Sequence, residues 1–92
     1  MNLSTCYQLT EGVAIRPERF GGLVYSYHSR QLYFLHSHEL ADFVGGLSGE
    51  EPLAAALETF RSRRSLSPEA GDGLLRSLAA LEKLGLVVAV GD

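Results

Sequence analysis

The segment GLVYSYHSRQLYFLHSHELADFVGGL, residues 22–47, predicts the centre of the fold. It contains two runs of aromatic and aliphatic residues, 23–27 and 32–35, of the kind that form strands. Ser29 and Arg30 separate the runs, so we expect a hairpin. Ser37 then suits the N-cap of a helix whose apolar residues recur at helical spacing, namely Leu40, Phe43, Val44 and Leu47.

The sequence before this segment predicts one further strand. Val13 and Ile15 suggest that strand, which could extend to Phe20, and Arg16-Pro17 should end or bend it because proline donates no ladder hydrogen bond. Gly21-Gly22 reads as a break before the hairpin. Residues 1–11 have little pattern, and we expect them to be loose.

Three helices are predicted in the second half of the chain. The first covers residues 38–44 and ends at Gly45-Gly46. Pro52 suits the first turn of the second, whose apolar residues are Leu53, Leu57 and Phe60. Ser67-Pro68-Glu69 is a strong start signal for the third, which ends at αL Gly85 and carries a stripe of Leu74, Leu75, Leu78, Leu81 and Leu84.

Residues 86–90 form a short β-prone tail. The predicted fold class is α+β and winged-helix-like, a three-stranded antiparallel sheet followed by three helices (βββααα). We find no repeat and no linker that would divide the chain, so residues 1–92 are expected to form a single domain.

Composition argues against several functions. The net charge of −3 disfavours nucleic acid, whose phosphates attract basic proteins. No signal peptide is visible, and no stretch approaches the roughly 20 apolar residues of a membrane span, so we expect a soluble, cytoplasmic protein without a membrane partner. Cys6 is the sole cysteine, so no internal disulfide can form.

No enzyme signature emerges from the sequence. His28, His36 and His38 invite a metal hypothesis, but no carboxylate or cysteine completes the set, and surface histidines near strand ends are the better interpretation. Cys6 lies in the segment expected to be loose, which argues against a role as a nucleophile. Neither glycine pair has the pattern of a phosphate-binding loop. We therefore predict no catalytic residue, no metal site and no cofactor.

One basic group stands out, formed by Arg61, Arg63, Arg64, Arg76 and Lys83. An ordinary solvated surface is the simplest interpretation. The functional alternatives are contact with an acidic peptide, or DNA binding by the third helix. Asp72 and Glu82 on that helix disfavour DNA.

The strongest functional signal is an open sheet edge. In a three-strand meander, the strand over residues 31–36 would be paired on one side only, and its LYFL run has no proline or lysine to block an added strand. Such an edge beside an apolar helix can capture an extended peptide. The alternative is that the edge is covered by the N-terminal segment or by a second copy of the chain.

The chain resembles the PqqD-like peptide chaperones, and among them the chaperones of mycofactocin biosynthesis (MftB type). The resemblance spans residues 13–88 and is carried by IRPERFGGLVYSYHSRQLYFLHSHELADFV (residues 15–44), with support from SPE (67–69) and LLRSLAALEKLGLV (74–87). The chain departs from the broader family at His36-Ser37, where asparagine and then a small or acidic residue is commoner, and at Gly71 and Gly73.

The resemblance implies a non-catalytic peptide chaperone. It would bind the leader of a ribosomally made precursor and present it to a radical S-adenosylmethionine maturase, which holds the iron–sulfur clusters and S-adenosylmethionine itself. The leader would add as a strand beside residues 31–35 and lie against the third helix. The implied binding residues are Gln31, Leu32, Tyr33, Phe34, Leu35, Leu75, Arg76, Leu78, Leu81 and Lys83. We expect Tyr33 and Leu35 to face the helices. The alternatives are a winged-helix DNA-binding regulator and a small subunit that stabilises a larger enzyme.

Overall fold

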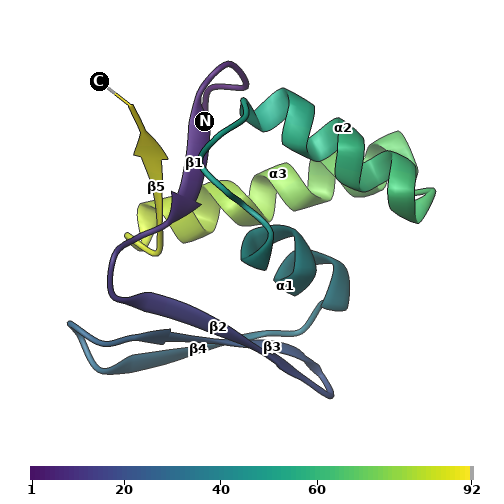
Figure 1. The fold of residues 1–92 in the computed structure, drawn as a ribbon. Helices are drawn as coiled ribbons and strands as arrows, with labels where there is room; N and C mark the ends of the chain where they lie inside the picture. Colours follow the sequence, from purple (N-terminus) through teal and green to yellow (C-terminus); the bar gives the residue numbers. More distant parts are fainter. Residues whose placement is uncertain (92) are drawn as a thin grey trace.

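The computed structural model describes residues 1–91 and places three helices on one side of a three-stranded antiparallel sheet (Figure 1). The sheet has the order β2-β3-β4, formed by Val13–Glu18, Gly21–Ser26 and Gln31–Leu35. The helices are α1 (His38–Gly45), α2 (Leu53–Arg64) and α3 (Pro68–Lys83). The predicted combination of three antiparallel strands and three helices is therefore confirmed.

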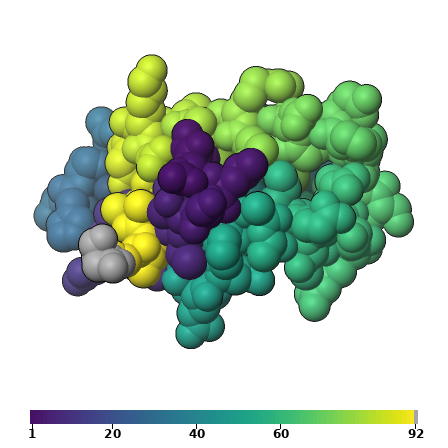
Figure 2. Space-filling model, turned by 90° about the horizontal axis from the view of Figure 1, so that it is seen from above, coloured from purple at the N-terminus to yellow at the C-terminus, as the bar shows by residue number. Residues whose placement is uncertain are grey.

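A second sheet of two strands was not predicted. β1 (Cys6–Leu9) pairs antiparallel with β5 (Val87–Val90), and Tyr7 of β1 is only 4% exposed within the core. The expectation that residues 1–11 are loose is thus wrong, and the element order is longer than βββααα at both ends. Figure 2 shows the N-terminal residues packed against the C-terminal strand and α2.

Hydrogen bonds to α2 explain why the N-terminal segment is ordered. The helix begins after Pro52, which supplies no side-chain cap and precedes the first turn instead of lying in it. The N–H groups of Leu53 and Ala54 donate to the carbonyl oxygens of Thr5 and Leu3, both at 2.9 Å. The segment therefore satisfies two of the backbone donors that a helix start leaves open.

The glycine pair Gly21-Gly22 was expected to interrupt the secondary structure, but it forms the first two residues of β3. Gly22 lies where α1 crosses the sheet, and a Cβ there would be 2.6 Å from the Cβ of Ala41. Gly21 has φ +147°, a conformation that favours glycine. Pro17 does not end its strand either, since β2 continues to Glu18, and Phe20 lies in the turn after it.

The ends of the other helices follow the sequence signals. The side chains of Ser37 and Ser67 each accept a hydrogen bond at 3.1 Å, from the N–H groups of Leu40 and Ala70. Gly85 follows α3 with φ +81°, as predicted for the αL position. α1 ends one residue later than predicted, with Gly46 as its C-cap.

Candidate functional site: an open strand edge beside a pocket

β4 is an edge strand of the sheet, and no residue of 1–91 pairs with its outer side. The direction of the backbone groups on β4 follows from the hydrogen bonds between β2 and β3. The Tyr27 N–H donates to the Gly12 carbonyl at 2.8 Å, so the backbone groups of every second residue of β3 point toward β2. The backbone groups of the residues between them, Gly22, Val24 and Ser26, point toward β4. Their partners on β4 are Leu35, Tyr33 and Gln31. The backbone N–H and C=O groups of Leu32 and Phe34 therefore point outward.

The opposite edge of the sheet, β2, is less suited to pairing. The same alternation directs the backbone of Val13, Ile15 and Pro17 away from β3. The Val13 N–H already donates to the Thr10 carbonyl at 2.9 Å, and Pro17 has no N–H. Only Ile15 can donate there, whereas β4 offers two donors and two acceptors in sequence.

The side chains of β4 divide between two faces, as the alternation of a strand requires. Leu35 is buried and Tyr33 packs against the core, so the prediction that these two face the helices is confirmed. The side chains of Leu32 and Phe34 lie on the outer face and are 50% and 59% exposed. The Tyr33 hydroxyl also donates to the Gln31 side chain at 2.6 Å.

An open pocket of about 300 Å³ lies where β4 ends, between the start of α1 and the first half of α3. The wall that follows β4 comprises Ser37, Glu39 and Leu40. The opposite wall comprises Leu66 of the α2–α3 loop with Ala70, Gly73, Leu74 and Ser77 of α3. The pocket is mainly apolar, with two hydroxyl groups and one carboxylate around it.

None of the predicted α3 residues (Leu75, Arg76, Leu78, Leu81 and Lys83) lines this pocket. Leu78 has no exposed surface and Leu81 is 6% exposed, so both belong to the core. Leu75 lies about 160° around the helix from Ser77, and Arg76 is exposed. Their role in peptide binding stays a prediction. Of the four α3 residues that line the pocket, Ala70, Gly73 and Ser77 have small side chains, and Gly73 was the one signal that could have indicated them.

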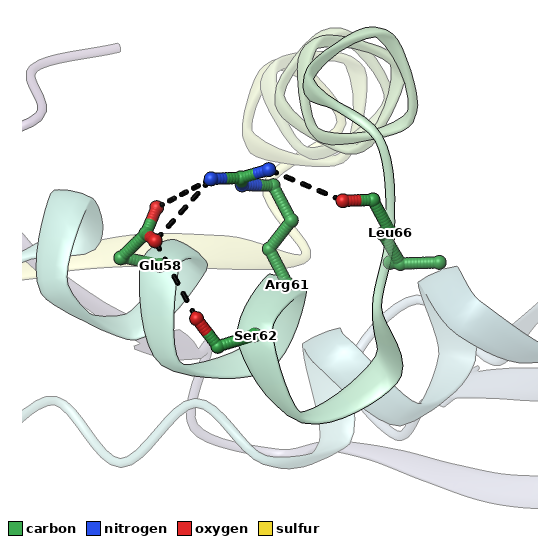
Figure 3. Close-up of polar contacts among 4 residues, drawn as sticks. All are labelled: Glu58, Arg61, Ser62 and Leu66. Atoms are coloured by element: carbon green, nitrogen blue, oxygen red, sulfur yellow. Dashed lines mark hydrogen bonds and ion pairs between the residues drawn. The ribbon is translucent and has the colours of Figure 1, made fainter.

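The basic group is divided by the fold. The Arg61 guanidinium donates to the Leu66 carbonyl at 3.1 Å, and this hydrogen bond joins α2 to the α2–α3 loop (Figure 3). Arg61 also forms an ion pair with Glu58 of the same helix. Arg64 forms an ion pair with Asp42 at 2.7 Å and lies 4.8 Å from the centre of the Phe60 ring. Within the described chain, no ion pair involves the three other members, Arg63, Arg76 and Lys83.

Three other open pockets, of about 290, 550 and 390 Å³, lie elsewhere on the described chain, and none of them is lined by a residue of β4. Across residues 1–91 there is no group of three or more histidine, cysteine, aspartate or glutamate residues that could hold a metal ion. His36 instead lies against the ring of Phe20, with 5.4 Å between the ring centres. In the same part of the chain, no helix is long and apolar enough to cross a membrane.

A comparison with family models finds a match over residues 6–88. The matching model is that of the peptide chaperone MftB family. The matched range covers nearly all of the described chain, including β1, the free edge of β4 and the α3 pocket. Neither the curated proteins nor the solved structures contain a significant match.

Proposed function

We propose a specific task for this chain, which belongs to the peptide chaperone MftB family. It binds the leader of a ribosomally made precursor, the mycofactocin precursor, and presents it to a radical S-adenosylmethionine maturase. The chain itself is not catalytic and needs no cofactor. The radical chemistry belongs to the maturase.

The observation that carries this proposal is the open edge of β4. Leu32 and Phe34 each direct one backbone donor and one acceptor outward, and these groups can pair with an extended peptide independently of its sequence. Strand addition of this kind binds the peptide through its main chain. The peptide then needs few specific side chains to be held.

Selectivity would come from the pocket at the end of β4. In a strand added to β4, every second side chain lies on the same face as Tyr33 and Leu35 and is directed toward the helices. A leader side chain near Ser37 could then enter the space between Leu40 and Leu74. We therefore expect the leader to require an apolar residue at that position.

Backbone amide exchange of the isotope-labelled chain tests the proposal. On addition of the precursor leader, the amides of Leu32 and Phe34 should gain protection from exchange. The amides of Tyr33 and Leu35 should change less, because they already donate within the sheet. Mass spectrometry of the same mixture should show an unchanged precursor. Protection confined to a distant surface, or a covalent change without the maturase, would contradict the proposal.

The remaining cations of α3 should affect the rate of association. Arg76 and Lys83 are exposed, and Arg76 lies close to the pocket, 3.9 Å from the position of a Cβ on Gly73. Replacing both with glutamate should slow binding of an acidic leader by about threefold to tenfold at low salt, because electrostatic attraction accelerates encounter. Stopped-flow measurements at two salt concentrations would check this. An unchanged rate would assign these side chains to an ordinary solvated surface.

A further inference from the structure

The outer face of the three-stranded sheet, opposite the helices, is uncovered among the described residues (Figure 1). Its β3–β4 part is apolar, whereas β2 contributes Ala14, Arg16 and Glu18 to this side, and Arg16 forms an ion pair with Glu18 at 2.7 Å. Leu23 and Tyr25 of β3 lie directly opposite Phe34 and Leu32 of β4 on this face. Phe20 and Tyr27 extend it at the two ends of β3 and are 37% and 61% exposed. We call these six residues the outer face.

The aromatic residues of the outer face are in mutual contact. The ring centres of Phe20 and Phe34 are 5.6 Å apart, and those of Tyr25 and Tyr27 are 4.6 Å apart with an edge-on geometry. Half of the eight exposed large hydrophobic residues of the described chain belong to this one face. An exposed patch of this kind marks an interaction surface, and tyrosine and phenylalanine are enriched in the centres of such surfaces.

The charge around the outer face identifies the kind of partner. Residues 13–36 contain Arg16, Arg19 and Arg30 but only one acidic residue, Glu18, so the net charge of this segment is +2. The net charge of the whole chain is −3, so the net charge of the remaining residues is −5. Arg19 lies in the turn at one end of β3 and Arg30 in the turn at the other. A face-to-face dimer would bring these arginines close to their counterparts, whereas a partner with carboxylates around an apolar centre would complement them.

We propose that the outer face docks on such a surface of the enzyme that modifies the bound peptide. This inference rests on the proposed function and adds the surface that meets the partner. The leader edge of β4 remains open in this arrangement, because outer-face side chains stand perpendicular to the backbone groups that pair with the leader. Leader and enzyme can therefore bind at the same time.

A leader bound to β4 would also enlarge the docking surface. The added strand continues the sheet, so every second leader side chain lies beside Leu32 and Phe34 on the outer face. The enzyme would contact chaperone and leader together. We expect it to bind the chaperone–leader complex about threefold to tenfold more tightly than the chaperone alone.

The test uses the purified radical S-adenosylmethionine enzyme and the precursor leader as separate probes. Threonine retains strand propensity, so a Leu23→Thr/Tyr25→Thr variant of β3 should stay folded, and it leaves the edge residues of β4 unchanged. Its affinity for the enzyme should fall at least tenfold, while leader affinity changes about twofold or less. Leu84→Thr is a matched control, because Leu84 is 55% exposed at the end of α3 and outside the outer face. It should leave both affinities unchanged.

The outcomes separate the two proposals. Unchanged enzyme affinity in the double variant, with the leader still bound, would overturn the docking inference and leave the proposed function intact. Failure of the wild-type chain to bind the leader would overturn the proposed function. A wild-type dimer that becomes monomeric in the double variant would assign the outer face to self-association and would also overturn the inference.

Discussion

Replacing Phe34 with proline is expected to weaken leader binding at least tenfold while the domain remains folded. The Phe34 N–H points out of the sheet, so proline removes a donor to the leader and breaks no bond to β3. The leader carbonyl would lose its partner, and an unsatisfied acceptor in a contact costs about 1–3 kcal/mol. A loss of about 1.4 kcal/mol already corresponds to a tenfold weaker affinity. Calorimetric titration with the leader would measure the effect.

Two variants control for the side chain and for the position. Phe34→Ala removes the ring but keeps the N–H, so it should bind the leader within about threefold of the wild type. Tyr33→Pro removes a donor that faces Val24 inside the sheet, so its main effect should be a lower unfolding temperature. Strand addition on β4 would be disproved if Phe34→Pro and Phe34→Ala bound the leader equally well.

The local parts of the fold were predictable because their signals lie close together in the sequence. Ser37 and Ser67 cap their helices as expected, and the two apolar runs on either side of Arg30 form the β3–β4 hairpin. The β1–β5 sheet could not be predicted in this way. Its strands have four residues each and pair across the whole chain, Cys6 with Val90 and Leu9 with Val87. Neither strand has a neighbour in the sequence that would indicate its partner.

The site was predicted less well than the fold, for a physical reason. A leucine stripe on a helix indicates which residues become buried, and Leu74, Leu78 and Leu81 are indeed in the core. A groove requires space, and the α3 side of this one is formed by Leu74 together with three small residues, Ala70, Gly73 and Ser77. Which backbone groups of β4 point out of the sheet also depends on the pairing register of the strands, and an apolar pattern alone does not give that register.

The basic group shows a related limit of sequence interpretation. Five cations in the second half of the chain suggested one surface, but an arginine can have structural partners that the sequence does not reveal. Arg61 bonds to the Leu66 carbonyl, and Arg64 pairs with Asp42 from another helix. The electrostatic prediction therefore concerns Arg76 and Lys83 on α3.

The pocket gives the second large effect, expected from Gly73→Leu. A Cβ at Gly73 would meet only the Arg76 guanidinium, at 3.9 Å, so a side chain can extend into the pocket without displacing the backbone. Glycine in a helix costs about 1 kcal/mol relative to alanine, so the variant should unfold at a higher temperature. Its leucine would occupy the space meant for an apolar leader residue, whose burial contributes about 1.5–3 kcal/mol. Leader affinity should then fall by roughly tenfold to a hundredfold.

If Gly73→Leu is more stable than the wild type, its weaker leader binding cannot result from unfolding. Gly73→Ala provides the first control, since it adds helix propensity with little volume and should largely retain binding. Gly71→Ala provides the second. Gly71 does not line the pocket, and its new Cβ would lie 3.2 Å from the Arg61 side chain, so any change should be in stability and not in leader affinity. If Gly73→Leu binds the leader as tightly as the wild type does, and the amides of Leu32 and Phe34 are still protected, the leader pairs with β4 without using this pocket.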